Sequence, residues 1–183
     1  MPRILSAFAA LIMGVLIMSN EALALDLENT LYLDLKDGRV TIELREDLAP
    51  KHVSRIKELT REGFYDGLKF HRVIEGFMAQ TGDPLGNGTG GSGMNLPAEF
   101  SRTPFERGTV GMARNGHDIN SGDSQFFIMF DRAPYLDGQY TVWGQVVDGM
   151  KYVDAIKLGE GGNGAVVGEP DVIVKMQVAA DAQ

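Results

Sequence analysis

The stretch FHRVIEGFMAQ occupies residues 70–80, and a second stretch, SQFFI, occupies residues 124–128. The two stretches supply Arg72, two glutamines and a set of large apolar side chains. Neither stretch places a nucleophile beside a general base in a recognised pattern. This inventory favours a reaction in which no covalent bond breaks.

Short alternating or apolar runs, within and around these stretches, predict β-strands. The first two runs are separated by Asp37-Gly38, a pair that favours a tight type I′ turn, and they predict a β-hairpin. The predicted strands are residues 31–35, 40–44, 70–74, 77–81, 110–113, 125–130, 140–146 and 172–178. The Gly-rich segment 82–93 and the polar segment 114–124 are predicted to be loops.

Two segments have helical spacing instead. The first begins at Pro50, carries apolar residues at positions 53, 56 and 59, and ends near Gly63. The second is shorter and carries apolar residues at positions 150, 153 and 156. Many short strands with two short helices predict a mostly β fold, a closed antiparallel barrel with a helix over each open end. Closure would leave no sheet edge.

Residues 1–24 have the pattern of a signal peptide. Arg3 supplies the positive charge, residues 4–18 are largely apolar, and Ala22-Leu23-Ala24 offers small residues at the cleavage positions. We expect cleavage after Ala24, a single mature domain over residues 25–183, and no stable membrane insertion afterwards. This predicts a protein of the periplasm, with secretion as the other destination. An uncleaved N-terminal anchor is the competing interpretation.

Composition limits the partners. The chain has 183 residues, a formal net charge of −8 and no cysteine. An acidic domain without a dense Lys/Arg cluster repels phosphate backbones, so we expect no nucleic-acid partner. Without disulfides, stability must come from an apolar core and hydrogen bonds.

Other chemistries have weak support in the sequence. The Gly-rich segment 82–93 satisfies G-x-G-x-x-G, but the residues after it are a poor helix start, so a tight loop is favoured over a dinucleotide site. The three histidines are far apart and predict no metal site; a structural or surface role is favoured for His71. Ser124 has no surrounding nucleophile motif.

Considered singly, the residues of the two opening stretches leave function undecided. An arginine in a strand, such as Arg72, is more often a surface residue or half of a salt bridge. Large apolar residues such as Phe77 and Phe127 are more often part of a core. Their joint pattern changes this interpretation.

Five segments carry that pattern in order: residues 70–80 (FHRVIEGFMAQ), 87–91 (NGTGG), 112–114 (MAR), 124–128 (SQFFI) and 136–138 (LDG). In order and spacing they closely resemble the cyclophilin family of peptidyl-prolyl cis-trans isomerases, over residues 30–178. The resemblance implies an eight-stranded antiparallel barrel capped by two helices. It also implies an enzyme that accelerates rotation about X-Pro bonds with no cofactor and no metal.

The resemblance assigns expected roles to individual residues. Arg72 is the expected catalytic residue, and Gln80 is expected to act beside it. The expected substrate-binding residues are Phe77, Met78, Gly88, Ala113, Arg114, Gln125, Phe127, Leu136 and Tyr140. The expected partners are proline-containing polypeptides, bound by a monomer.

Three features depart from the family pattern. Tyr140 stands where many cyclophilins carry histidine, and it can still pack an aromatic face on proline. Tyr135 stands where many carry tryptophan; because the indole N–H is missing, we expect weak binding of cyclosporin-type macrocycles. The segment 114–124 is longer than in the commonest forms, which leaves the match at Asn115 open.

Two other functions compete with isomerisation. A binding module or chaperone would hold proline-containing segments without catalysis, and a catalytic assay separates these two. A barrel carrying a small ligand would need a hollow interior, whereas the apolar residues at strand positions predict a filled one with binding on the outer face. For an exported isomerase, the expected role is to assist the folding of envelope proteins.

Overall fold

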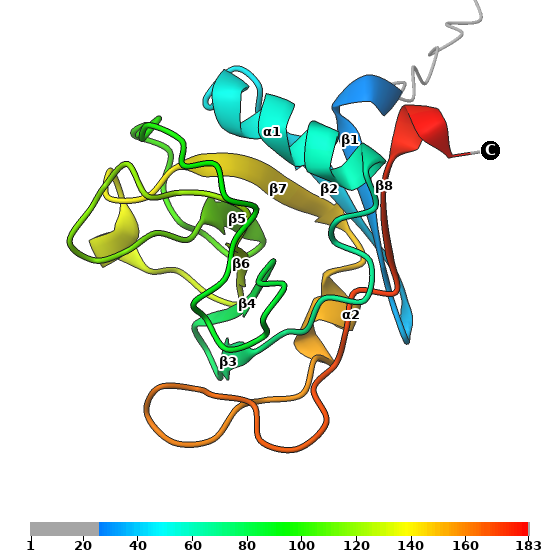
Figure 1. Ribbon diagram of the computed structural model, residues 1–183, viewed down its shortest axis with the longest axis vertical. Coiled ribbons are helices and arrows are strands. Elements are labelled where there is room, and N and C mark those ends of the chain that lie inside the picture. Colours follow the sequence, from blue (N-terminus) through cyan, green and yellow to red (C-terminus); the bar gives the residue numbers. More distant parts are fainter. Residues whose placement is uncertain (1–25, 183) are drawn as a thin grey trace, which may run out of the picture.

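The structure is a computed structural model that describes residues 26–182, so the predicted signal peptide lies outside the described residues. One antiparallel sheet of eight strands forms the body, together with two α-helices (Figure 1). The strands are β1 (Thr30–Leu35), β2 (Gly38–Leu44), β3 (Arg72–Ile74), β4 (Met78–Thr81), β5 (Thr109–Met112), β6 (Phe126–Met129), β7 (Val142–Asp148) and β8 (Lys175–Val178). The helices are α1 (Pro50–Arg61) and α2 (Met150–Asp154), with short 3-10 helices η1 (Leu27–Asn29), η2 (Pro134–Leu136) and η3 (Ala179–Asp181).

The sheet is open and curled, which corrects the predicted closed barrel. Its strands follow the order β3-β4-β6-β5-β7-β2-β1-β8, so β3 and β8 are the two ends, and no ladder within the described residues joins them. Another segment occupies the outer edge of β3: Arg72 bridges to Ala165, and Val73 N donates to Gly164 O at 2.7 Å. Among residues 26–182, the two ends of the sheet meet only through the residues that precede these strands: Lys69 bridges to Val172, and Phe70 N donates to Asp171 O at 2.9 Å.

The first hairpin forms as predicted, with a shifted turn. Leu35 pairs with Gly38, so Lys36 and Asp37 are the two turn residues. A side chain at position 38 would overlap the ring of Tyr152, which packs against this glycine. Gly38 is therefore needed for packing within the strand, and the expected Asp37-Gly38 turn is displaced by one residue.

Helix α1 has the predicted bounds and buried face. Pro50 occupies its first turn, and Val53, Ile56 and Leu59 are at most 1 % exposed. The helix start is capped from a distant loop: Glu99 accepts hydrogen bonds from two backbone amides of the first turn, at 3.1 and 3.0 Å. A carboxylate at this position satisfies helix donors and matches the helix dipole. No helix among residues 26–182 is long and apolar enough to cross a bilayer.

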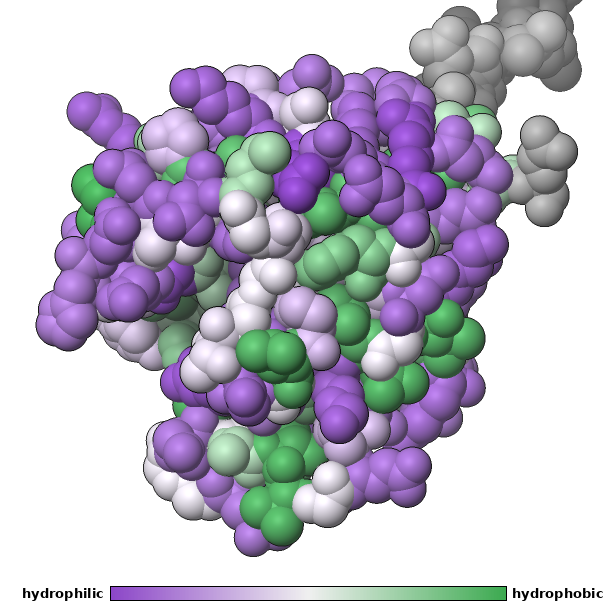
Figure 2. Space-filling view, viewed as in Figure 1, coloured by the Kyte–Doolittle hydropathy of each residue, from purple (hydrophilic) through white to green (hydrophobic). Residues whose placement is uncertain are grey.

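Successive side chains along a strand point to opposite faces of the sheet, so the apolar side chains form two separate clusters. In β6, Phe126 and Ile128 join the main core, which also holds Trp143, whereas Phe127 and Met129 join a second, smaller cluster on the other face. Buried apolar side chains from the strands and both helices make up the main core, which agrees with the expectation of a filled interior. The outer surface seen in Figure 2 is mostly hydrophilic. The second cluster forms the floor of the candidate site.

Candidate active site

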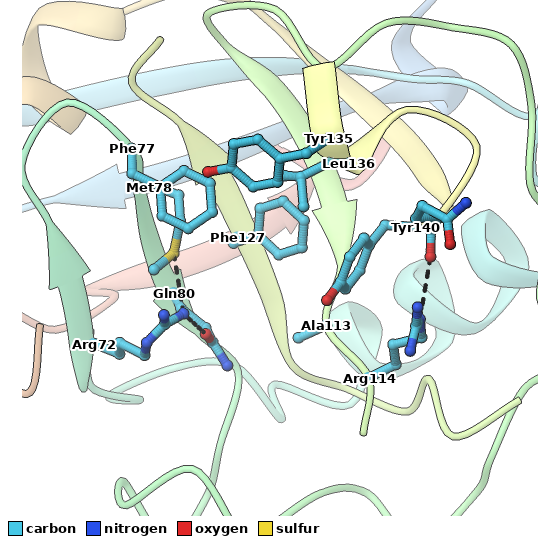
Figure 3. Close-up of a pocket in the computed structure, with 11 residues that line it drawn as sticks. Arg72, Phe77, Met78, Gln80, Ala113, Arg114, Phe127, Tyr135, Leu136 and Tyr140 are labelled. Carbon is cyan, nitrogen blue, oxygen red and sulfur yellow. Dashed lines mark hydrogen bonds between the residues drawn. The ribbon is translucent and has the colours of Figure 1, made fainter. Parts of the chain in front are cut away.

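A cavity of about 420 Å³ lies over the second apolar cluster, on the outer face of the sheet. Strands β3, β4 and β6, the residues after β5 and the 3-10 helix η2 contribute its walls (Figure 3). The lining residues are Arg72, Phe77, Met78, Gln80, Ala113, Arg114, Phe127, Tyr135, Leu136, Gln139 and Tyr140. Its size and its mixture of aromatic walls with a few polar groups are those of a site for a small ligand group.

The floor of this cavity is apolar and tightly supported. Phe127 is 5 % exposed, and its ring stacks on Phe105 at 5.7 Å between centroids while Tyr140 meets it edge-on at 5.7 Å. Gly111 pairs with Phe127 across the β5–β6 ladder, and a Cβ there would lie 2.6 Å from the ring of Phe105. The missing side chain at Gly111 therefore lets both rings pack against the sheet. Such a floor is shaped to hold a compact apolar ring.

Arg72 stands at one side of the floor and is held by neutral acceptors. Its Nε donates to Asn163 O at 2.9 Å, and its Nη1 donates to Gln80 Oε1 at 3.1 Å. Among the described residues it forms no ion pair, and its Nη2 has no hydrogen-bond acceptor. The guanidinium is thus fixed in direction, is not paired with a described carboxylate, and has a donor left for a ligand.

A chain of amides leads away from Arg72. Gln80 Nε2 donates to Gln125 Oε1 at 2.9 Å, and Gln125 Nε2 donates to Gly88 O at 3.1 Å and to Gly90 O at 2.8 Å. Each amide therefore turns its oxygen toward Arg72 and its nitrogen toward the Gly-rich loop. The loop and the guanidinium are connected through two side chains.

A second cavity, of about 480 Å³, adjoins the first and is lined by the Gly-rich loop. The two cavities share Gln80, Ala113 and Arg114 as a common wall. The predicted substrate-binding residues that do not line the first cavity, Gly88 and Gln125, line this one. The site is therefore a pocket with an adjoining groove.

A buried carboxylate shapes the Gly-rich loop. Asp83 is 1 % exposed and accepts hydrogen bonds from the backbone N–H groups of Leu85 at 2.8 Å, Asn87 at 2.9 Å and Gly88 at 2.5 Å. Burial opposes ionisation, but these three donors outweigh it and hold the pKa of Asp83 below its usual value. A Cβ at Gly90 would overlap Asp83 Oδ1. The glycines let the loop close around this charge.

On the opposite side of the floor, Arg114 is fixed above an aromatic ring. Its guanidinium lies 4.6 Å from the ring centroid of Tyr140. Its Nε donates to Gln139 O at 3.1 Å, and its Nη1 donates to Asn115 O at 2.9 Å. Figure 3 shows Arg72 and Arg114 on the two sides of the apolar floor.

The structure brings all eleven predicted site residues to these two cavities. It adds residues that the sequence did not single out. Asn163 holds Arg72 through a backbone carbonyl, and Gln139 holds Arg114 in the same way, so neither side chain gave a signal. The acidic residue within the Gly-rich loop, Asp83, was a signal that could have been used.

The residues considered for other chemistry lie elsewhere. His71 is half-buried and faces the Gly-rich loop, since a Cβ at Gly88 would lie 3.8 Å from its Nε2. Burial lowers the pKa of His71. Ser124 is fully buried and donates its hydroxyl to Gly82 O at 2.8 Å. Within residues 26–182 no group of three or more His, Cys, Asp or Glu side chains could hold a metal ion.

Comparison with known proteins agrees with this geometry. Residues 30–178 match the family model described as cyclophilin type peptidyl-prolyl cis-trans isomerase. A probable peptidyl-prolyl cis-trans isomerase of Brucella suis is 55 % identical over 190 residues, covering 97 % of this chain and 95 % of the relative.

Solved structures agree as well. A cyclophilin from Hirschia baltica superposes with a TM-score of 0.75 at 28 % identity, covering 87 % of this chain and 77 % of that one. A cyclophilin type isomerase of Cryptosporidium parvum, solved in the presence of the dipeptide Ala-Pro, gives a TM-score of 0.73 at 26 % identity over 81 % of this chain and 98 % of that one. The apolar pocket with its fixed arginine thus belongs to a chain that is a member of the cyclophilin-type peptidyl-prolyl cis-trans isomerase family.

Proposed function

We propose that this isomerase acts through Arg72, with the proline ring of a polypeptide held on the Phe127 floor. Rotation about a peptide bond is opposed by a barrier of about 18–20 kcal/mol because nitrogen shares its lone pair with the carbonyl. Before proline the two isomers are close in energy, yet exchange takes roughly tens to hundreds of seconds. A catalyst must therefore bind the twisted state better than either planar state.

In the twisted state the prolyl nitrogen becomes pyramidal and regains its lone pair. A donor aimed at that nitrogen strengthens its hydrogen bond only at that moment. Arg72 can supply this donor without losing a proton, because an arginine guanidinium is not deprotonated in proteins. One charge-assisted hydrogen bond, at about 1.5–3 kcal/mol, accounts for roughly ten- to a hundredfold in rate.

The remaining acceleration is assigned to the rest of the pocket. The apolar floor holds the ring still while the carbonyl turns, and Gln80 offers an amide beside the moving group. Exclusion of water by the aromatic walls strengthens both effects. No covalent intermediate takes part.

The single observation that carries this proposal is the state of Arg72. Its guanidinium is oriented by a backbone carbonyl and an amide oxygen, it has no carboxylate partner among the described residues, and it lies at the edge of an apolar pocket. An arginine that served stability alone would be expected in an ion pair, as most described arginines of this chain are.

The test is two-dimensional NMR exchange on an Ala-Pro peptide. Arg72→Ala should lower the exchange rate by at least tenfold while its unfolding curve stays close to that of the wild type. Arg102→Ala is the matched control, because Arg102 is exposed, has no ion pair among the described residues and lies outside both cavities. A folded Arg72→Ala protein that retains the wild-type rate would refute the role of Arg72. A wild-type protein that binds the peptide without accelerating exchange would instead favour a binding module.

We further propose that the enzyme is exported and assists the folding of envelope proteins as a monomer. The support is the signal-peptide pattern of residues 1–24, which precedes the matched family region. Cell fractionation with mass spectrometry of the purified protein tests this. A periplasmic chain that starts at Leu25 is expected, and a cytoplasmic chain that retains residues 1–24 would contradict it. Light scattering on the purified chain tests the monomer.

A further inference from the structure

The charge of the residues that line the first cavity differs in sign from the net charge of the whole chain. The chain carries a formal charge of −8, yet the only charged residues that line the first cavity are Arg72 and Arg114. Most arginines in residues 26–182 are neutralised by a carboxylate, namely Arg39, Arg45, Arg55, Arg61, Arg107 and Arg132. The two pocket arginines have no such partner within that range. The charged side chains that line the first cavity are therefore positive in a chain whose net charge is negative.

The Arg114 side chain is held ready for an anion. Backbone carbonyls fix its Nε and Nη1, and the ring of Tyr140 supports its plane. Its Nη2 has no acceptor among the described residues. Because its direction is already fixed, little side-chain entropy is lost when a carboxylate binds.

The position of Arg114 defines which part of the substrate it meets. It lines both the proline pocket and the adjoining cavity, so it stands beside the residue that leaves the pocket toward that cavity. The one acidic group of the adjoining cavity, Asp123, is already engaged: its carboxylate accepts from Ser92 N at 2.9 Å and from Gly93 N at 2.8 Å. Asp123 keeps its own charge but forms no ion pair with Arg114 within residues 26–182, so Arg114 still has a donor free at this boundary.

We propose that Arg114 is a specificity-determining residue that selects prolyl segments with an acidic side chain next to the proline, on the side that faces the second cavity. This inference rests on the proposed function, because it presupposes that proline occupies the first cavity. The acidic side chain accepts a hydrogen bond from Arg114 Nη2 in an ion pair at the rim. Isomerisation of such segments is faster than that of uncharged ones of the same shape.

The experiment measures a charge preference, defined as the exchange rate of a Glu-containing prolyl peptide divided by that of its Gln counterpart. Glu or Gln is placed at one position on either side of the proline, with alanine elsewhere. When the Glu or Gln stands on the side of the proline that faces the second cavity, the charge preference of the wild type should be about two- to fivefold higher than that of Arg114→Gln. This factor corresponds to the strength of an exposed ion pair. For the other side the two proteins should agree. Arg114→Lys, which keeps the charge, should retain part of the preference.

Ionic strength separates a charge effect from a structural one. Raising the salt from about 0.01 M to about 1 M shortens the Debye length from about 30 Å to about 3 Å, so the difference between wild type and Arg114→Gln should shrink. Equal preferences in the two proteins at low salt, with both peptides isomerised, would overturn this inference and leave the proposed function standing. Exchange of neither peptide by the wild type would overturn both.

Discussion

Arg72 and Gln80 face each other across the β3–β4 ladder, and Arg72 Nη1 donates to Gln80 Oε1 at 3.1 Å. The same amide donates to Gln125 at 2.9 Å, so its orientation is fixed from both sides. Neutral amides, and not a carboxylate, therefore aim the arginine. A carboxylate partner would have offset the positive charge on which the proposed mechanism depends.

Replacing Gln80 should therefore impair catalysis more than stability. In Gln80→Leu the guanidinium loses an oriented acceptor and the substrate loses an amide, and we expect the exchange rate to fall on the order of tenfold. Gln177→Leu is the control, because Gln177 is a half-buried glutamine on β8 with one hydrogen bond, far along the sheet from the pocket. NMR exchange on an Ala-Pro peptide gives both rates. Equal rates for the two variants would show that Gln80 has no part in the reaction.

The Gly-rich loop offers a matched pair of alanine substitutions. Gly90 and Gly116 both have backbone angles open to any residue, but a Cβ at Gly90 would overlap Asp83 Oδ1, whereas a Cβ at Gly116 meets nothing within 4 Å. Gly90→Ala should lower the unfolding free energy by about 1–3 kcal/mol, as overpacking does. It should also slow exchange, because Gly90 O holds Gln125.

Gly116→Ala should change the unfolding free energy by less than about 0.5 kcal/mol. Urea unfolding with peptide exchange on both variants checks the pair. If Gly90→Ala matched Gly116→Ala in both measurements, Asp83 would not shape the loop that supports the site.

We predict that Tyr135 weakens the binding of cyclosporin-type macrocycles. Its side chain is 68 % exposed and packs on Phe77 at 5.8 Å between ring centroids, at the rim of the pocket. Tyr135→Trp adds an indole N–H at this rim and should strengthen macrocycle binding by about two- to tenfold, the value of one neutral hydrogen bond. Isothermal titration calorimetry measures this. Tyr135→Phe is the control, and a gain as large as that of Tyr135→Trp would assign the effect to ring packing.

The His52–Glu99 contact should make stability depend on pH. Burial lowers the pKa of His52, which is 1 % exposed, although its Nδ1 lies 2.6 Å from Glu99 Oε2. Burial opposes ionisation of Glu99, but the hydrogen bonds from His52 and the helix amides outweigh it and hold its pKa below the usual value. Both groups thus bind protons more weakly in the folded chain than in the unfolded chain.

The direction of the pH dependence follows from proton binding, because the unfolding free energy rises with pH wherever the unfolded state binds more protons than the folded state. The contribution of His52 to the unfolding free energy is present above a pH of about 6.5 and is lost as the pH falls below that value. The contribution of Glu99 to the unfolding free energy is lost below a pH of about 4.5. Urea unfolding between pH 7.5 and pH 5 should show falling stability in the wild type and a smaller slope in His52→Gln. The matched control is the exposed His117→Gln variant, which leaves the His52–Glu99 contact in place. Stability that increased toward pH 5 would mean that His52 is charged in the folded protein.

Local patterns predicted the elements of this fold well. The spacing of Val53, Ile56 and Leu59 located α1, and alternation located β1 and β2, because these signals lie within a few residues. The closure of the barrel was predicted wrongly, since it depends on which segment occupies the edge of β3, and residues near 165 take that place. Such long-range competition leaves no mark in a local pattern.

The candidate site likewise has features that the sequence predicted and features that it could not predict. Its side chains were predicted because the residues between 70 and 140 resemble a known family. The contacts that orient these side chains were not predictable. Asn163 holds Arg72 through its backbone carbonyl, a group that every residue possesses. Gly111 could not be recognised either, because its role is the space that it leaves for the rings of Phe105 and Phe127.

The pairing of β1 with β8 places the two termini of the described chain side by side, from Leu31 opposite Val178 to Asp34 opposite Lys175 (Figure 1). β1 is the first described strand to be synthesised and β8 the last. The backbone groups on this edge of β1 therefore find their hydrogen-bond partners only when β8 has been made. Contacts so distant in sequence favour slow folding after synthesis is complete. We therefore expect this chain to complete its sheet only after its final residues have been made.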